Sequence, residues 1–214
     1  MDQKDIQSFS EQTVNRYSTR FKEMQHSIRT LGWGTKEQQE FRFVEVLKRL
    51  DATGKSVLDI GCGFGDLFNF MQSCDFDFEK YIGWDITPDF IENPLITDKN
   101  IELKVWNIAE DQPSRTVADI GIMLGLLNWN WKNEEKNYDY STKVIRNAFE
   151  AVNDVLVIDF LSTQTEPNYP KEEIVFYHDP LIMLNKVMEI TPNVDLVHSY
   201  PSIPQKEFLL YLYK

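Results

Sequence analysis

Residues 56–67 read Ser-Val-Leu-Asp-Ile-Gly-Cys-Gly-Phe-Gly-Asp-Leu, and they are the most informative segment of the chain. It opens with a short apolar run, 57–60, which is typical of a buried strand, and continues into glycines at alternate positions, Gly61, Gly63 and Gly65. Glycine lets a backbone turn tightly at positive φ and lets a ligand approach closely. Because a helical pattern follows, we expect a nucleotide-like ligand at the carboxyl end of a first parallel strand.

The spacing of the glycines limits the kinds of ligand that the loop can bind. A dinucleotide fingerprint, Gly-x-Gly-x-x-Gly, would place its third glycine at position 66, which is Asp66, whereas the third glycine here is Gly65. Asp59 stands two residues ahead of the first glycine. A carboxylate there would repel a pyrophosphate and attract a ligand that carries an ammonium and a sulfonium. The loop therefore favours a cationic ligand over a dinucleotide.

Strand, acid, glycine triplet and helix together resemble the first motif of the class I S-adenosylmethionine-dependent methyltransferases, acid-x-Gly-x-Gly-x-Gly. This resemblance implies S-adenosylmethionine as cofactor and S-adenosylhomocysteine as product. Residues 32–43, Gly-Trp-Gly-Thr-Lys-Glu-Gln-Gln-Glu-Phe-Arg-Phe, further resemble the Gly-Trp…Gln-x-x-Arg-Phe cap motif of a broad group of small bacterial methyltransferases. That group has a Gly-x-Phe-Asn signature, matched here by residues 125–128 with leucine in place of phenylalanine, and a last strand like 207–213. Most of its members have no known acceptor.

Strand-like and helix-like segments alternate along the chain, which predicts an α/β fold with a parallel sheet. We expect an N-terminal helical cap over 1–50 and a Rossmann-like core over 51–214, forming one methyltransferase domain over 1–214. The expected strands are 57–60, 81–85, 101–106, 118–124, 155–160, 194–200 and 208–213, with helices at 66–74, 138–152 and 180–190. The short join before the last strand predicts an antiparallel C-terminal hairpin in a doubly wound, mostly parallel, seven-stranded sheet. The resemblance implies that the last strand lies between the fifth and the sixth.

Composition limits the partners. The net charge is −12, from 22 basic and 34 acidic residues, and no Lys/Arg stripe is present, which disfavours nucleic acid as the acceptor. The acidic surface mildly favours neutral or cationic small partners, although many ordinary cytosolic proteins have the same composition. No apolar run suggests a membrane span or a signal peptide, so we expect a cytoplasmic protein, a monomer or a homodimer. The two cysteines suggest neither a disulfide framework nor a metal cluster.

Candidate cofactor-binding residues follow the carboxyl ends of the strands. Asp85 is expected to accept both ribose hydroxyls while Ile86 packs on adenine; a turn or helix-capping acid is the alternative for Asp85. Asn107 and the amide of Ile108 can bind the adenine edge, although a plain turn asparagine is nearly as good an interpretation. The resemblance adds three residues of the cap, Trp33, Gln39 and Arg42. Arg42 is expected to pair with the cofactor carboxylate, and a solvated helix residue is the alternative. The complete set is Trp33, Gln39, Arg42, Asp59, Gly61, Cys62, Gly63, Asp85, Ile86, Asn107, Ile108, Leu124 and Gly125.

Candidate catalytic residues are fewer. Asn128, three residues after Gly125, can point toward the transferred methyl, and the absence of prolines there argues against nucleic-acid bases and glutamine amides as acceptors. His178, ahead of a predicted helix, is the best candidate for a general base, against the simpler interpretation of a structural or solvated histidine. Asp159, near a strand end, can touch the acceptor or serve only as a turn partner. Tyr17, Trp129 and Trp131 can line an acceptor pocket or simply pack.

The sequence therefore predicts a methyltransferase that acts by direct displacement on oxygen or nitrogen of a small metabolite or sugar-like acceptor, without a metal. The alternatives are a protein methyltransferase, a non-catalytic regulatory or scaffold subunit that binds the same cofactor, and, more weakly, a nicotinamide-linked enzyme.

Overall fold

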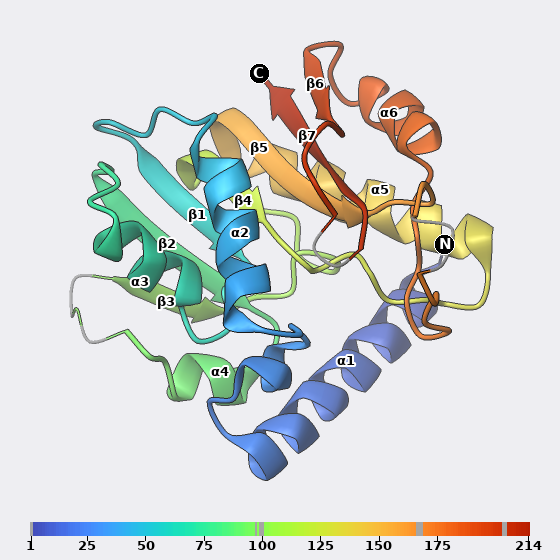
Figure 1. Cartoon of the computed structure of the whole chain (residues 1–214), viewed down its shortest axis with the longest axis horizontal. Coiled ribbons are helices and arrows are strands. Elements are labelled where there is room, and N and C mark those ends of the chain that lie inside the picture. The colour runs from blue at the N-terminus through green and yellow to red at the C-terminus, as the bar shows by residue number, and fades with distance from the viewer. Residues whose placement is uncertain (1, 97, 99–100, 166–168, 203–204) are drawn as a thin grey trace.

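The computed structural model describes residues 2–96, 98, 101–165, 169–202 and 205–214 (Figure 1). In chain order its elements are α1 (Gln3–Met24), the 3-10 helix η1 (Ile28–Leu31), α2 (Lys36–Leu47), β1 (Ser56–Ile60), α3 (Asp66–Ser73), β2 (Lys80–Asp85), α4 (Pro88–Glu92), β3 (Glu102–Val105), β4 (Ala118–Met123), α5 (Glu134–Glu150), β5 (Val152–Leu161), α6 (Pro180–Met188), β6 (Val194–Val197) and β7 (Glu207–Tyr213).

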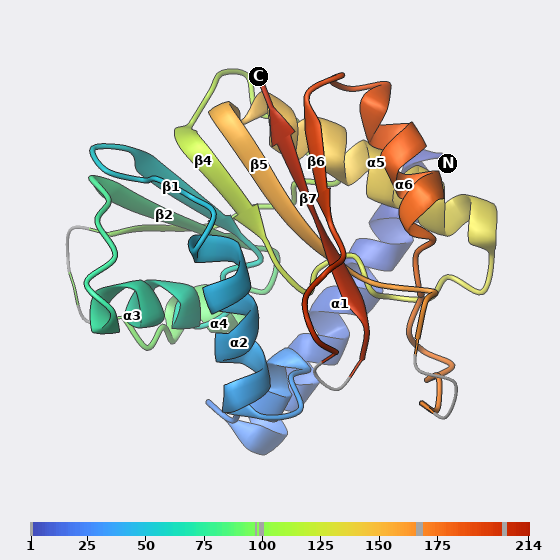
Figure 2. The same ribbon diagram turned by 45° about the horizontal axis from the view of Figure 1, so that its top comes forward.

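The strands of the described chain form a seven-stranded sheet in the order β3-β2-β1-β4-β5-β7-β6. Neighbours from β3 to β5 pair in parallel, and β7 pairs antiparallel with both β5 and β6 (Figure 2). Both the predicted fold class and the insertion of the last strand are therefore confirmed. Residues 203 and 204, in the predicted join before that strand, lie outside the described residues.

Each face of the sheet has its own core, because successive side chains of a strand point to opposite faces. Along β1, Val57 packs with residues of α2 and α3, whereas Leu58 and Ile60 pack with residues of α5 and α6. Helices thus cover both faces of the sheet (Figure 1). Because helices cover both faces of the sheet, polar side chains gather at the ends of the strands.

The N-terminal cap lies across the sheet edge at which the parallel strands end (Figure 1). Near its start α1 is tied to α5 by an ion pair between Asp5 and Lys136, whose Oδ2 and Nζ lie 2.8 Å apart. Near its end Phe21 packs with Phe64 of the glycine loop and Phe90 of α4. Since α1 is anchored at both ends, it forms a fixed wall over the strand ends.

Apolar spacing along the helix before the first strand predicts that Val44 faces the core, and this prediction is wrong. Val44 is 46% exposed, whereas Arg42 and Glu45 are buried on the inner face of α2. Glu45 is neutralised there by Lys48 and Arg49. Paired charges therefore take the place of apolar side chains on this helix, which hydrophobic spacing cannot reveal.

Among the described residues, no helix combines the length and apolar character that crossing a membrane requires.

Candidate active site

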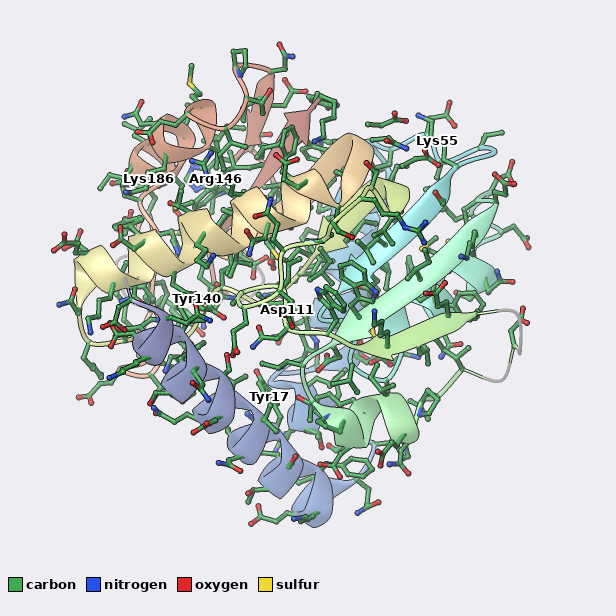
Figure 3. The ribbon with its side chains drawn as sticks, turned by 180° about the vertical axis from the view of Figure 1, so that it is seen from behind. Tyr17, Lys55, Asp111, Tyr140, Arg146 and Lys186 are labelled. Atoms are coloured by element: carbon green, nitrogen blue, oxygen red, sulfur yellow. The ribbon has the colours of Figure 1, made fainter. Side chains whose placement is uncertain are left out.

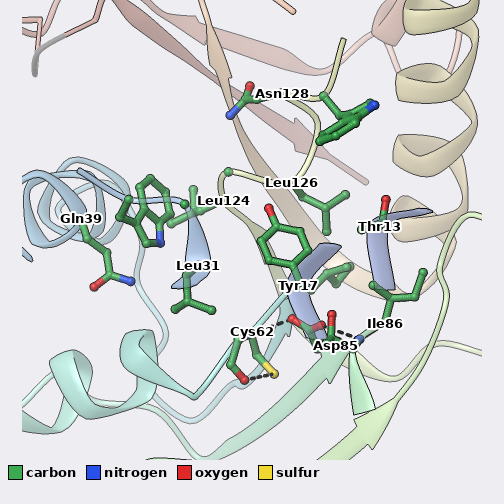
Figure 4. Close-up of a pocket in the computed structure, with 18 of the residues that line it drawn as sticks. Thr13, Tyr17, Leu31, Gln39, Cys62, Asp85, Ile86, Leu124, Leu126 and Asn128 are labelled. Carbon is green, nitrogen blue, oxygen red and sulfur yellow. Dashed lines mark hydrogen bonds between the residues drawn. The ribbon is translucent and has the colours of Figure 1, made fainter. Parts of the chain in front are cut away.

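A cavity of about 510 Å³ lies at the carboxyl ends of β1, β2 and β4, beneath α1 and α2 (Figure 4). Its lining includes every residue that the sequence analysis named for cofactor binding, together with Asn128. The parallel strands bring these residues together because their carboxyl ends share one edge. His178 and Asp159 do not line it.

The first half of the cavity, the glycine-loop half, is formed by Asp59, Gly61, Gly63, Asp85 and Ile86. Gly61 has φ +82° and its N–H donates to the carbonyl of Trp84 over 2.7 Å, which fixes the turn after β1. A Cβ at Gly61 would lie 2.8 Å from Cδ1 of Leu126, so a side chain there would be both strained and crowded. The loop requires glycine for two physical reasons.

Asp85 ties this loop to the end of β2. Its Oδ2 accepts the N–H of Gly63 over 3.0 Å, and its Oδ1 accepts the N–H of Thr87 over 2.8 Å. Each carboxylate oxygen has a second lone pair, so the group can still accept two hydroxyls of a ligand. The carboxyl is buried, and this burial raises its pKa. Asp85 therefore serves as the turn acid of the alternative interpretation and remains able to bind a ribose.

Asp59 adds a second buried acid under the loop. Its Oδ2 accepts the hydroxyl of Tyr81 over 2.5 Å, and burial raises its pKa to about 7, with the nearby Asp85 and Asp66 adding to the effect. Such a carboxyl is half-protonated near neutral pH. A cation beside it would favour the ionised form and so would be attracted into the cavity.

Cys62 contributes its backbone and not a nucleophile. Its N–H donates to the carbonyl of Trp84 over 3.0 Å, and its side chain is buried. Burial and the surrounding carboxylates raise the pKa of the thiol well above its ordinary value, so the sulfur stays protonated.

Arg42 has partners within the protein. Its Nε donates to Oε1 of Glu207 on β7 over 2.7 Å, and its Nη1 donates to the carbonyl of Gln38 over 2.7 Å. The guanidinium also stacks 4.8 Å from the ring centre of Trp33. Arg42 is buried and paired with Glu207, so its alternative of a solvated residue is wrong. Because Arg42 lines the cavity, its pairing with a cofactor carboxylate stays a prediction. The pair with Glu207 joins α2 to the last strand.

Gln39 and Trp33 line the cavity together with Arg42, and Figure 4 labels Gln39 among the lining side chains. The Nε2 of Gln39 donates to Oδ2 of Asp66 over 3.4 Å. A Cβ at Gly125 would lie 3.0 Å from Cη2 of Trp33, so the indole covers the turn after β4. The predicted cap motif thus closes this end of the cavity.

Asn107 is engaged within the protein. Its Nδ2 donates to Ser10 on α1 and to Glu110, each over 2.7 Å, and its Oδ1 accepts the N–H of Ala109. These bonds fit the turn asparagine of the alternative interpretation. The bond from its side chain to the adenine amino group stays a prediction, since Oδ1 has a second lone pair and Asn107 lines the cavity. Ile108, which also lines the cavity, offers its backbone amide, while its carbonyl accepts from Asn147.

His178 is a structural residue. It is fully buried among the rings of Phe160, Phe176 and Tyr138, with Nε2 3.0 Å from Oγ of Ser141. This burial lowers its pKa to about 3, so the ring stays neutral. The prediction of His178 as general base is wrong, because the side chain packs beneath the strand ends and does not reach the cavity.

Asp159 acts through the backbone of its neighbour. Its Oδ1 accepts the N–H of Gly125 over 2.6 Å, and burial raises its pKa to about 6. The predicted contact with an acceptor is wrong, since Asp159 lies behind Gly125 and holds the β4 turn. Asn128, in contrast, lines the cavity, and its Oδ1 accepts the N–H of Leu161 over 3.4 Å, leaving its Nδ2 available.

The second half of the cavity, the aromatic half, is lined by Phe9, Arg16, Trp129, Tyr140 and Ile174. The sequence predicts a pocket-lining role for Trp129 and for Tyr17 on α1, but not for Phe9, Arg16, Tyr140 or residues 172–175. The local sequence of α1, which is mostly polar, does not predict that Phe9 faces a cavity. Figure 3 shows Tyr140 on α5 on the side that faces α1.

Of the two other aromatic residues predicted to line an acceptor pocket, one lines the cavity and one does not. Tyr17 lines the cavity and lies above Asp85 (Figure 4). Trp131 does not line it; its ring stacks on Phe9, with the centroids 4.1 Å apart.

Comparison with solved structures identifies the architecture. Magnesium protoporphyrin IX methyltransferase from Synechocystis PCC 6803, solved with bound S-adenosylmethionine, superposes with a TM-score of 0.66 at 13% identity over all of this chain and 98% of that one. An S-adenosylmethionine-dependent methyltransferase from Mesorhizobium loti superposes with a TM-score of 0.60 at 10% identity over 82% of this chain and 97% of that one. This chain has the class I methyltransferase fold.

Two further matches cover a smaller share of the other protein. The small RNA methyltransferase HEN1 superposes with a TM-score of 0.61 at 15% identity, over 82% of this chain and 25% of that one. A protein of Invertebrate iridescent virus 6, 235L, named as a candidate methyltransferase, is 23% identical over 184 residues, which cover 82% of this chain. The chain spans 66% of the length of this curated relative. No protein-family model matches the sequence.

Within the part of the chain that the structure describes, no group of three or more His, Cys, Asp or Glu side chains is arranged to hold a metal ion.

Proposed function

We propose that this protein is a methyltransferase that uses S-adenosylmethionine to methylate oxygen or nitrogen of a small acceptor. The observation that carries the proposal is the joint placement of the Gly61–Gly63 turn and the Asp85 carboxylate in one cavity at the carboxyl edge of the sheet. Neighbours with the same fold were crystallised with S-adenosylmethionine or S-adenosylhomocysteine, which supports this choice of cofactor.

The electrostatics of the glycine-loop half support a cationic cofactor over a dinucleotide. Asp59, Asp66 and Asp85 all lie there, and burial raises the pKa of each. A pyrophosphate would meet these carboxyls as a like charge, whereas an ammonium and a sulfonium would favour their ionised forms. The ribose of the cofactor is proposed to bind Asp85, with adenine against Ile86.

The bound cofactor would supply an electrophilic methyl group on a good leaving group, so the protein has to align the acceptor and exclude water. Leu126 and Trp33 cover the turns at Gly61 and Gly125. Asn128 is proposed to orient the acceptor through its Nδ2. Since neither His178 nor Asp159 reaches the cavity, positioning is the proposed mechanism.

A small acceptor is supported by the helix that lies over the cavity. Helix α1 crosses it and is anchored at both ends, by Asp5–Lys136 and by Phe21 packed on Phe64. A protein acceptor would need an open groove across this cap. The net charge of −12 supports a small acceptor over nucleic acid as well.

A non-catalytic cofactor-binding subunit is the second candidate, because neither predicted proton acceptor lines the cavity. Titration calorimetry with S-adenosylmethionine, S-adenosylhomocysteine and NAD⁺ tests the first step, and saturable binding of the first two alone is expected. Mass spectrometry of candidate acceptors, for the mass gain of one methylene unit, tests turnover. Binding without turnover on any acceptor would favour the subunit, and binding of NAD⁺ alone would overturn both.

A further inference from the structure

The aromatic half of the cavity has a continuous ring surface. The centroid of Phe9 lies 6.0 Å from that of Trp129 and 4.9 Å from that of Tyr140, and both contacts are edge-to-face. Trp131 stacks behind Phe9 and fixes its orientation. Ile174, which is 46% exposed although large and apolar, completes the rim. Flat apolar faces of this kind stack well on a planar ring.

The ring surface of Phe9, Trp129 and Tyr140, here called the aromatic wall, is continuous with the glycine-loop half. Leu126 covers Gly61, and Asn128 and Trp129 follow it along the same segment. This segment is pinned by the N–H of Phe176 donating to the carbonyl of Asn128 over 2.9 Å, and by a bridge between Trp129 and Val175. A ring bound against Trp129 would therefore lie beside the ligand held by the glycine turn.

Arg16 brings a positive charge to this wall. Its guanidinium lies 4.5 Å from the ring centre of Trp129, and the residue is half-buried and lines the cavity. Among the described residues it makes no hydrogen bond or ion pair with a carboxylate, and Glu172, the acid on the same wall, lies in solvent without an ion pair to it. A guanidinium stacked on an indole keeps its in-plane N–H groups free to bind a carboxylate in a bidentate manner.

The two halves thus carry opposite charge. The glycine-loop half holds Asp59, Asp66 and Asp85, whereas the arginines of α1, Arg16 and Arg20, face the cavity from the other side. Arg20 is occupied by the carbonyl of Arg29, so Arg16 is the arginine of this pair that is open to a ligand. A ligand of the aromatic half should carry a planar ring that stacks on these side chains and a negative group that pairs with Arg16.

We propose that the acceptor is a planar aromatic compound that carries a carboxylate, with its ring on the wall of Phe9, Trp129 and Tyr140 and its carboxylate on Arg16. This inference rests on the proposed function, since it names the substrate class of the same cavity. It makes Arg16 the residue that selects a charged aromatic acceptor over a neutral one.

The test is a calorimetric titration of the full chain saturated with S-adenosylhomocysteine. The probes are two matched pairs, 3-hydroxy-2-naphthoate with 2-naphthol and salicylate with phenol, together with cyclohexanecarboxylate as a carboxylate without an aromatic ring. At least one aromatic acid should bind about tenfold or more tightly than both its uncharged partner and the aliphatic acid, as expected for a charge-assisted contact.

The variant Arg16→Gln should abolish this preference, lowering the affinity for the aromatic acid to that of its uncharged partner, while Arg16→Lys should keep part of it. Arg146→Gln is the matched control, because Arg146 is exposed on α5 outside the cavity (Figure 3) and should change nothing. Unchanged affinity of Arg16→Gln for S-adenosylhomocysteine shows that the variant is folded.

The inference is overturned if neither acid binds better than its uncharged partner, if cyclohexanecarboxylate binds as well as the aromatic acids, or if Arg16→Gln loses S-adenosylhomocysteine instead of the acid. Failure of the parent protein to bind S-adenosylhomocysteine at all is a separate result, which would sink the proposed function.

Discussion

The two halves of the cavity are built in different ways. The glycine-loop half comes from the ends of two neighbouring parallel strands, β1 and β2, and its groups are fixed by backbone hydrogen bonds such as Gly63 N–H to Asp85. The aromatic half is assembled from α1, the segment after β4, α5 and residues 172–175, and is fixed by ring packing. Residues of the glycine-loop half can therefore rarely be substituted. Residues of the aromatic half can be substituted while the fold is kept.

Charge separates the halves as well. Buried carboxyls with raised pKa values gather at the glycine turn, and the arginine open to a ligand, Arg16, stands among aromatic rings. This separation of charge fits the proposed cationic cofactor in the glycine-loop half and the proposed acceptor in the aromatic half. Substitutions in the glycine-loop half should therefore abolish cofactor binding, while those in the aromatic half should change the acceptor.

The largest effect is expected at Gly61. In Gly61→Val the side chain would meet Leu126, since a Cβ there lies 2.8 Å from its Cδ1, and the turn at φ +82° would be strained. Calorimetry should show an affinity for S-adenosylmethionine reduced by roughly a hundredfold or more, because the backbone can no longer approach the ligand.

Gly54→Val is the matched control. Gly54 has φ +67° but no heavy atom within 4 Å of a built Cβ, and it lies outside the cavity. Both variants should lose about 1–2 kcal/mol of stability from the left-handed backbone, yet only Gly61→Val should lose the cofactor. Equal binding by the two variants would break the comparison.

The next effect is expected at Asp85. Asp85→Asn removes the charge that accepts the Gly63 and Thr87 amides and the proposed ribose, so the affinity for S-adenosylmethionine should fall by about 2–4 kcal/mol. Asp119→Asn is the control, since Asp119 accepts the N–H and the hydroxyl of Ser56 at the amino ends of the strands. Unaltered affinity in Asp85→Asn would refute the ribose assignment.

A smaller effect is expected from pH. Asp59 has a pKa raised to about 7, and a cationic ligand binds its ionised form better, so affinity for S-adenosylmethionine should rise about tenfold from pH 6 to pH 8. Asp59→Asn should bind weakly and lose most of this rise. A parent protein whose affinity stays flat across this range would show that Asp59 does not face the cation.

The same carboxyl predicts the pH dependence of stability. Folding raises the pKa of Asp59 above its ordinary value, so the folded state holds the proton more tightly than the unfolded chain does. Its contribution to stability is then full below pH about 4, falls as the pH rises to about 7, and is constant above that. Thermal unfolding at pH 8 should therefore give a higher Tm for Asp59→Asn than for the parent, and a lower Tm would contradict this account.

The smallest effect on function is expected at His178. In His178→Gln the affinity for S-adenosylmethionine, measured by calorimetry, should change by less than about twofold, because the side chain packs outside the cavity. The free energy of unfolding should fall by about 1–3 kcal/mol, because a fully buried ring and its contact with Ser141 are changed. A large loss of cofactor affinity with intact stability would restore His178 to the site.

The sequence predicted the glycine-loop half well because its signals are local. A strand, an acid and closely spaced glycines lie within residues 56–67, and Asp85 directly ends the next strand. Parallel pairing then brings them together without any long-range choice. The order of the sheet was predicted from the resemblance and is confirmed.

The errors arose where a side chain has a partner far away in the chain. Arg42 pairs with Glu207, 165 positions later, and Asp159 bonds the amide of Gly125. His178 is enclosed by rings from β5 and α5, which no local pattern reveals. The aromatic half likewise depends on where α1 lies, and tertiary packing alone determines this.

A crystal structure of the protein grown with S-adenosylhomocysteine would show directly whether the cavity holds the cofactor. We expect both ribose hydroxyls on the Asp85 carboxylate, with the homocysteine portion along the turn from Gly61 to Gly63. A cavity left empty at saturating ligand, or a ligand bound away from Asp85, would contradict this expectation.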